Sequence, residues 1–179
     1  MSKKPIDDLL RGTRSIAAFV PDPDGLFGDC TQGFSWDKSI PDRPFARFGV
    51  PYGDDEDPQV IPFHEALEPL LNGIQEQFSF RPNSCSCHWY LRGDSFMGFH
   101  SDNVEDIGEG TGVIIVSLGG ERILRFKQKD DPAVTHDFCL ASGDLLFMNS
   151  ELQETWTHGV PKQAGSDQRI SQVFRCIPY

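Results

Sequence analysis

The sequence has little positive charge and lacks a long apolar run. Its 179 residues contain 16 lysines and arginines against 27 aspartates and glutamates, giving a formal net charge of −11. This balance argues against a broad surface for binding phosphates. No segment approaches the roughly 18 apolar residues of a membrane span. No apolar run of the kind found in a secretory signal follows the first lysines, so we expect a cytoplasmic location.

Cysteine pairs with the spacing of a zinc site are also missing. The five cysteines are odd in number, and no two of them are separated by two residues. Reduced thiols are the simplest interpretation. Cys85 and Cys87 fall on one face of an expected strand, and we interpret them as core packing.

The length and composition predict one globular domain. Hydrophobic residues make up 38% of the chain and charged residues 24%, which is typical of a folded domain. We predict a single domain over residues 1–179. An N-terminal lid and helix region would cover residues 1–83, and the core would cover residues 84–179.

The N-terminal region is rich in proline, glycine and aspartate. Residues 21–29 and 41–45 read as turns. Short apolar pieces at 16–20 and 45–50 fit edge strands or loops. The acidic run 54–57 fits a solvated loop.

One helix is indicated before the core. Leu67, Leu70, Leu71 and Ile74 recur at helical spacing, and Phe78 continues the series. Pro69 would lie in the first turn of this helix, where proline is tolerated.

From residue 84 onward the pattern changes to short strands separated by turns rich in glycine, aspartate and proline. Eight such strands are expected, at residues 84–91, 95–101, 113–118, 122–127, 134–140, 144–149, 155–160 and 169–177. Eight short antiparallel strands are typical of a jelly roll. We therefore predict an all-β core, a double-stranded β-helix, with N-terminal helix and loop decoration.

Three residues in this core could hold a metal ion. His100 and Asp102 are two residues apart, so on a strand their side chains point to the same face. His158 lies on a later strand. Two histidines and one carboxylate form the facial triad of non-haem Fe(II) oxygenases, which leaves the opposite face of the metal open for a chelating cosubstrate and dioxygen.

The last strand carries an unusual polar face. Arg169, Ser171 and Arg175 share one face, while Ile170 and Phe174 point the other way. Arginines directed into a barrel need a partner, because a buried charge is costly. A dicarboxylate would provide one through two-pronged, charge-assisted hydrogen bonds.

These motifs resemble the AlkB-type Fe(II)/2-oxoglutarate dioxygenases. The pattern His100-x-Asp102, His158 and Arg169-x5-Arg175 is similar to that of the family. So are the segments 90–103, 117–126 and 143–162. The resemblance covers about residues 84–179, while the first eighty residues match loosely.

The resemblance implies a role for each matched residue. His100, Asp102 and His158 would hold Fe(II), and Arg169 would bind the distal carboxylate of 2-oxoglutarate. The remaining cosubstrate residues would be Arg175, Tyr90, Ser171 and His88. Dioxygen would convert 2-oxoglutarate to succinate and carbon dioxide and hydroxylate a substrate C–H bond. Hydroxylation next to a nitrogen would then release formaldehyde.

Two positions depart from the family pattern. His88 stands where many members have an asparagine, and Val104 stands where many nucleobase-repair members have an acid. Base recognition also needs aromatic surfaces for stacking. The candidate substrate residues are Val104, Trp89, Tyr52 and Phe48, with Phe45 as a further aromatic.

The sequence leaves the substrate open. One class is an N-alkylated nucleobase in single-stranded nucleic acid or a nucleotide, which the family resemblance favours. The other is a small metabolite, an amino acid or a protein side chain, which the net charge and Val104 favour. We expect weak or no binding to duplex DNA, and a monomer. A non-catalytic jelly-roll module that binds a metal or ligand is the alternative from another class.

Overall fold

The computed structural model describes residues 4–52 and 59–178. The acidic run 54–57 lies outside them. The described strands are β1 (Thr13–Ile16), β2 (Phe45–Gly49), β3 (Ser84–Tyr90), β4 (Met97–His100), β5 (Gly112–Gly119), β6 (Arg122–Gln128), β7 (Thr135–Leu140), β8 (Leu145–Asn149), β9 (Trp156–Val160) and β10 (Arg169–Arg175). The helices are α1 (Lys4–Gly12), α2 (Pro23–Gly33), α3 (Glu68–Phe78) and α4 (Leu152–Thr155), with 3-10 turns η1 (Glu65–Leu67) and η2 (Val104–Asp106).

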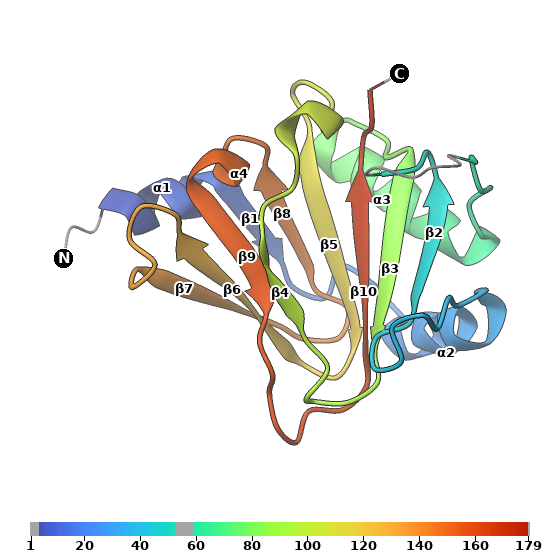
Figure 1. Cartoon of the computed structure of the whole chain (residues 1–179). Coiled ribbons are helices and arrows are strands. Elements are labelled where there is room, and N and C mark those ends of the chain that lie inside the picture. Colours follow the sequence, from blue (N-terminus) through green and yellow to red (C-terminus); the bar gives the residue numbers. More distant parts are fainter. Residues whose placement is uncertain (1–3, 53–58, 179) are drawn as a thin grey trace.

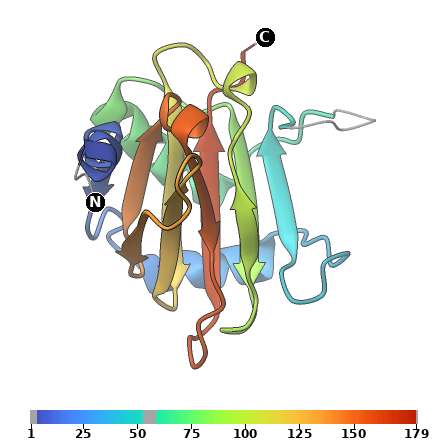
Figure 2. The same cartoon turned by 60° about the vertical axis from the view of Figure 1, so that its left-hand side comes forward.

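Two antiparallel sheets face each other. The large sheet has six strands in the order β1-β8-β5-β10-β3-β2, and the small sheet has four in the order β4-β9-β6-β7. Figures 1 and 2 show the two sheets as layers, with the chain crossing from one sheet to the other several times. This arrangement confirms the predicted double-stranded β-helix.

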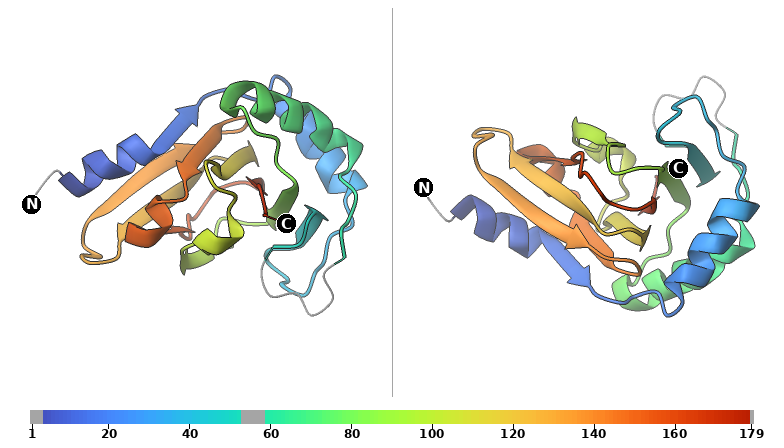
Figure 3. Two further views of the ribbon diagram at one scale, coloured as in Figure 1. Left: turned by 90° about the horizontal axis from the view of Figure 1, so that it is seen from above. Right: turned by 90° about the horizontal axis from the view of Figure 1, so that it is seen from below.

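Helices α2 and α3 cover the outer face of the large sheet, as Figure 3 shows from above and below. Leu70, Leu71 and Ile74 of α3 pack against outward-facing residues of the central strands, such as Ile114 and Phe174. A second core lies between the sheets. The central strand β5 contributes to both cores, so its apolar residues form a continuous run.

All eight strands predicted from residue 84 onward are present, with ends within two residues of the expected ones. The helix with Pro69 in its first turn is confirmed as α3. Cys85 and Cys87 are buried, as the core-packing interpretation predicted. Within the described residues, no helix has both the length and the apolar character that crossing a membrane requires.

The N-terminal region is more ordered than its composition suggested. Strand β2 confirms the edge strand expected at 45–50. Strand β1 ends at Ile16, so the expectation of a strand at 16–20 was wrong beyond its first residue. The turn assigned to 21–29 was also wrong, because α2 begins there. The Asp22 carboxylate accepts a hydrogen bond from the backbone N–H of Gly25, and Pro23 occupies the first turn.

Candidate metal centre

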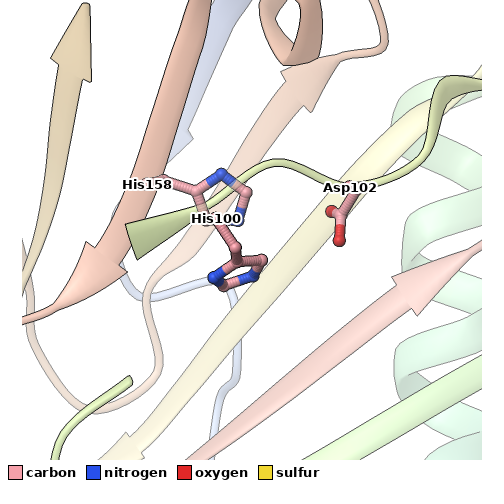
Figure 4. Close-up of side chains that lie close together, drawn as sticks. All are labelled: His100, Asp102 and His158. Carbon is pink, nitrogen blue, oxygen red and sulfur yellow. The ribbon is translucent and has the colours of Figure 1, made fainter. Parts of the chain in front are cut away.

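The two candidate histidine ligands lie on neighbouring strands. His100 ends β4 and pairs directly with His158 on β9, and the centroids of their rings are 4.5 Å apart. Asp102 follows β4 by two residues. The ligand atoms of the three residues all lie within 4.8 Å of one another. Figure 4 shows the three side chains gathered at this point, so the structure brings together the triad expected from the sequence.

The two oxygens of Asp102 have different surroundings. Oδ1 accepts hydrogen bonds from Arg175 Nη2 at 2.8 Å and from the Tyr52 hydroxyl at 3.0 Å. Oδ2 is buried and has no hydrogen-bond partner among the described residues. Burial is the largest influence and would raise the pKa of Asp102, but the charge and hydrogen bond of Arg175, together with His158 and His100, outweigh it and hold that pKa below its usual value. The carboxylate is therefore ionised, with one oxygen available to a ligand.

Both imidazoles are suited to bind a metal. His100 Nδ1 lies 2.8 Å from the carbonyl oxygen of Gly98, which can only accept a hydrogen bond. Nδ1 therefore carries the proton and leaves the lone pair on Nε2. Burial lowers the pKa of His158 to about 4, so this ring is neutral at physiological pH.

This donor set fits Fe(II). Two imidazoles and one carboxylate are the ligands of the non-haem iron triad. The buried, unpartnered Oδ2 of Asp102 is otherwise a costly feature, and a cation beside it would remove that cost. Thus His100, Asp102 and His158 would hold the ion.

Arg169 lies deep between the sheets and fits a carboxylate. It is 1% exposed. Its Nε donates to the Ser117 hydroxyl at 2.9 Å, and its guanidinium lies 5.3 Å from the ring centroid of Tyr90. Nη1 is buried with no partner within the described parts of the chain. Burial lowers the pKa of Arg169 to about 10, so the group remains charged at neutral pH. No carboxylate among residues 4–52 and 59–178 forms an ion pair with it.

A pocket of about 420 Å³ opens at the metal ligands. It is lined by His100, Asp102, Arg175, Arg43, Arg47, Tyr52, His88, Phe45, Met97, Ile40, Ser86 and Ser101. His88 and Ser171 are direct partners in the β3–β10 register, so their side chains share the inner face of the large sheet. Arg175 keeps two buried guanidinium nitrogens without partners among the described atoms, Nε and Nη1.

Two of the candidate substrate residues lie away from this pocket. Trp89 stands between His88 and Tyr90 on β3, so it points to the opposite face, where it packs against Trp36 at 5.3 Å. Phe48 is buried in the same outer core and contacts Phe34. The assignment of both aromatics as stacking surfaces beside the metal was therefore wrong.

The other candidates differ in position. Tyr52 lines the pocket, with its ring 3.9 Å from the Arg175 guanidinium. Its hydroxyl donates a hydrogen bond to the carboxylate of Asp102. The sequence gave no reason to expect this contact. Val104 begins the turn η2, is 36% exposed and is not among the pocket-lining residues.

Sequence reasoning missed several supporting residues. Gln153 is buried in α4, and its side-chain oxygen accepts the backbone N–H of Asp102 at 2.9 Å. Ser117 supports Arg169, and Arg43 contacts His88. Each of these residues contacts a partner that is far away in the sequence. No local sequence pattern therefore indicates its role. A polar residue inside the apolar run of β5 was the one available signal, for Ser117.

The fold and the donor set together define a class of enzyme, the dioxygenases that use non-haem Fe(II) and 2-oxoglutarate. A model of the 2OG-Fe(II) oxygenase superfamily matches residues 47–175, and the chain belongs to that superfamily. The intact triad within this family sets aside the alternative of a non-catalytic module.

The sequence is similar to AlkB homologues. It is 28% identical over 124 residues to the human alpha-ketoglutarate-dependent dioxygenase alkB homolog 3, covering 64% of this chain and 43% of the relative. It is 30% identical over 131 residues to the DNA N(6)-methyladenine demethylase ALKBH1A of Arabidopsis thaliana, covering 72% of this chain and 34% of the relative. The matches thus span less than half the length of these relatives.

Solved structures share the fold. A structure of OsALKBH1 superposes with a TM-score of 0.65 at 18% identity, covering 92% of this chain and 97% of that one. An oxidoreductase of the 2OG-Fe(II) oxygenase family from Burkholderia pseudomallei gives the same TM-score and identity, covering 98% and 89%. The AlkB-like jelly roll is therefore established for this chain.

Proposed function

We propose that this dioxygenase oxidatively demethylates an N-alkylated nucleobase, presented in single-stranded nucleic acid or as a nucleotide. The observation that carries the proposal is the pocket at the metal ligands, which Phe45 and Tyr52 line together with His100. Aromatic side chains are the usual stacking surfaces for an unpaired base. The names of the two relatives described above, an AlkB homologue and a DNA N(6)-methyladenine demethylase, support the same substrate class.

Different residues of the chain would bind the cosubstrate and the metal ion in such a reaction. Arg169 would bind one carboxylate of 2-oxoglutarate in a two-pronged contact. His100, Asp102 and His158 would hold Fe(II), which activates dioxygen. Tyr52 and Arg175 keep the Asp102 carboxylate in place through Oδ1, which would leave Oδ2 available to hold the ion.

The reaction balances without a further reductant. One oxygen atom of O2 enters succinate, formed as 2-oxoglutarate loses carbon dioxide. The other enters the N-methyl group as a hydroxyl. The hydroxymethyl C–N bond then breaks, the hydroxyl proton moves to the nitrogen, and formaldehyde leaves.

A second candidate is the hydroxylation of a small metabolite, an amino acid or a protein side chain. The net charge of −11 favours it, because few phosphates can be neutralised by such a chain. The identity of residue 104 favours it too: a valine stands where many nucleobase-repair members have an acid, and it cannot accept a hydrogen bond from the exocyclic amine of a base.

A succinate and formaldehyde assay separates the two candidates. The Fe(II)-loaded protein would be offered single strands and mononucleotides carrying N-methylated bases, with unmethylated strands as controls, and in parallel pools of methylated and unmethylated amino acids and metabolites. We expect methylated bases to yield formaldehyde and succinate in equal amounts. Succinate formation stimulated by a metabolite or an amino acid alone would contradict the nucleobase proposal and support the second candidate.

A further inference from the structure

Arg43 contacts a pocket residue that departs from the family pattern. It lies in the segment between α2 and β2, ahead of the residues matched by the family model. Its Nη1 is 3.1 Å from Nδ1 of His88 on β3. Both side chains line the pocket that opens at the metal ligands.

The chemistry of this pair fixes where the His88 proton lies. A guanidinium has donors and no acceptor, and it stays protonated at any physiological pH. Nδ1 of His88 must therefore accept the hydrogen bond from Arg43. In a neutral ring the proton is then on Nε2, which becomes a hydrogen-bond donor.

The surroundings of His88 keep the ring neutral and call for an anion. Burial and the nearby charges of Arg43, Arg175, His100 and Arg169 lower the pKa of His88 to about 3. The charges that shift this pKa are positive, and the one carboxylate that lines the pocket, that of Asp102, is already paired with Arg175. Arg175 also has two buried nitrogens without partners in the described chain. A neutral donor beside unsatisfied guanidinium groups is suited to a carboxylate.

We propose that Arg43 is a positioning residue that holds His88 in the Nε2–H tautomer, and that His88 then donates a hydrogen bond to a carboxylate of 2-oxoglutarate. An amide at this position donates through its NH2 group without help, whereas an imidazole donates in the required direction only in one tautomer. The hydrogen bond from Arg43 to Nδ1 selects that tautomer of His88. The inference requires that the enzyme bind 2-oxoglutarate. It does not depend on which substrate the enzyme oxidises.

The tautomer can be read without metal or turnover. In metal-free protein with 15N-labelled histidine, NMR correlations distinguish protonated from unprotonated ring nitrogens, and the five histidines are few enough to assign. The His88→Asn spectrum identifies the His88 signals. We expect protonated Nε2 and unprotonated Nδ1 in the native protein, and a mixture of tautomers in Arg43→Ala. A native protein with the proton on Nδ1, or a tautomer unchanged in Arg43→Ala, would overturn the proposal.

The effect on the cosubstrate is tested by a double-mutant cycle. The affinity of Mn(II)-loaded protein for 2-oxoglutarate would be measured by calorimetry. We expect Arg43→Ala to weaken binding about tenfold in the native background and less than about twofold in the His88→Asn background, where the tautomer no longer matters. An equal loss in both backgrounds would contradict the role of Arg43 through His88.

Arg92→Ala is the matched control. Arg92 is exposed and pairs with Asp42, the residue next to Arg43, so this variant also removes one cation and loosens the same segment. We expect it to leave 2-oxoglutarate affinity within about twofold of the native value. A loss as large as that of Arg43→Ala would show that charge or segment order, and not the contact with His88, accounts for the effect.

Discussion

Tyr52 connects the segment after β2 to the metal centre. Its hydroxyl donates to Asp102 Oδ1 and accepts the backbone N–H of Asn103 at 3.2 Å, while its ring lies against Arg175. The Tyr52 hydroxyl thus holds both the Asp102 carboxylate and the backbone of the next residue, Asn103. This contact adds a function to a residue expected only to touch substrate.

Removing the Tyr52 hydroxyl should weaken the metal site. In Tyr52→Phe, Asp102 keeps Arg175 and loses one donor, and a hydrogen bond to an ionised carboxylate is worth about 1.5 kcal/mol or more. We expect the affinity for Mn(II) or Co(II) to fall about tenfold, measured by calorimetry, with the fold intact by circular dichroism. Unchanged affinity would show that Arg175 alone positions the carboxylate.

Arg169 provides a second test at the scale of one side chain. Lysine at this position keeps the charge but cannot form a two-pronged contact with a carboxylate. We expect Arg169→Lys to lower the affinity for 2-oxoglutarate by about tenfold, measured by calorimetry on Mn(II)-loaded protein, while metal affinity survives. If Arg169→Lys binds normally and Arg175→Lys does not, the roles of the two arginines are reversed.

At the scale of the element, strand β2 places Tyr52 over the pocket. Gly49 ends β2 with a φ of +76°, and its N–H donates to the carbonyl of Ile61. A Cβ added at Gly49 would collide with the carbonyl oxygen of Asn83. The direction in which the chain leaves the strand toward Tyr52 therefore depends on glycine.

We expect Gly49→Ala to lower the free energy of unfolding by at least about 2 kcal/mol, from left-handed strain and the backbone collision. Gly28→Ala is the matched control, because Gly28 lies within α2 and a Cβ there meets nothing within 4 Å. This variant should raise stability by up to about 1 kcal/mol. Denaturant unfolding measures both, and equal effects would contradict the account of Gly49.

The strands and the pair His100 and Asp102 could be predicted because their signals are local, whereas His158 was added from the ligand set of the non-haem iron triad. Alternation with a period of two placed His100 with Asp102, and Arg169 with Arg175, and turn residues marked the strand ends. Helix α2 was missed because Gly25, Gly28 and Gly33 lower its helical propensity, although Asp22 and Pro23 form a good start. The helix is stabilised by packing on the large sheet. A local sequence pattern gives no information about that packing.

The environment of the metal could not be predicted for a related reason. Gln153 reaches Asp102 across 51 positions, and Arg43 reaches His88 across 45. Such pairs depend on which strands and loops become neighbours in the fold. Arg43, for example, reaches His88 because β2 pairs with β3 in the large sheet. The direction of Trp89 was open to prediction, because its neighbours His88 and Tyr90 were already assigned to the inner face and strand residues alternate.

At the scale of the whole molecule, the net charge bears on the partner. Long-range repulsion from a chain of charge −11 opposes any polyanion. We predict weak binding to unmodified duplex DNA at physiological salt, with a shallow dependence on salt, measured by fluorescence anisotropy on labelled duplex and single strand. Tight duplex binding with a log–log salt slope steeper than about −4, which corresponds to four or more phosphate contacts, would reveal a local basic groove.

The most direct test of the account measures succinate formed from 2-oxoglutarate in the presence of Fe(II). His100→Ala, His158→Ala and the double variant each remove a metal ligand, and we predict that turnover falls by at least about 100-fold. His136→Ala is the control, because His136 lies on β7, packed against Phe138 and outside the metal cluster, and should retain turnover within about twofold. Persistent 2-oxoglutarate decarboxylation in the double variant would contradict the assignment of the metal centre.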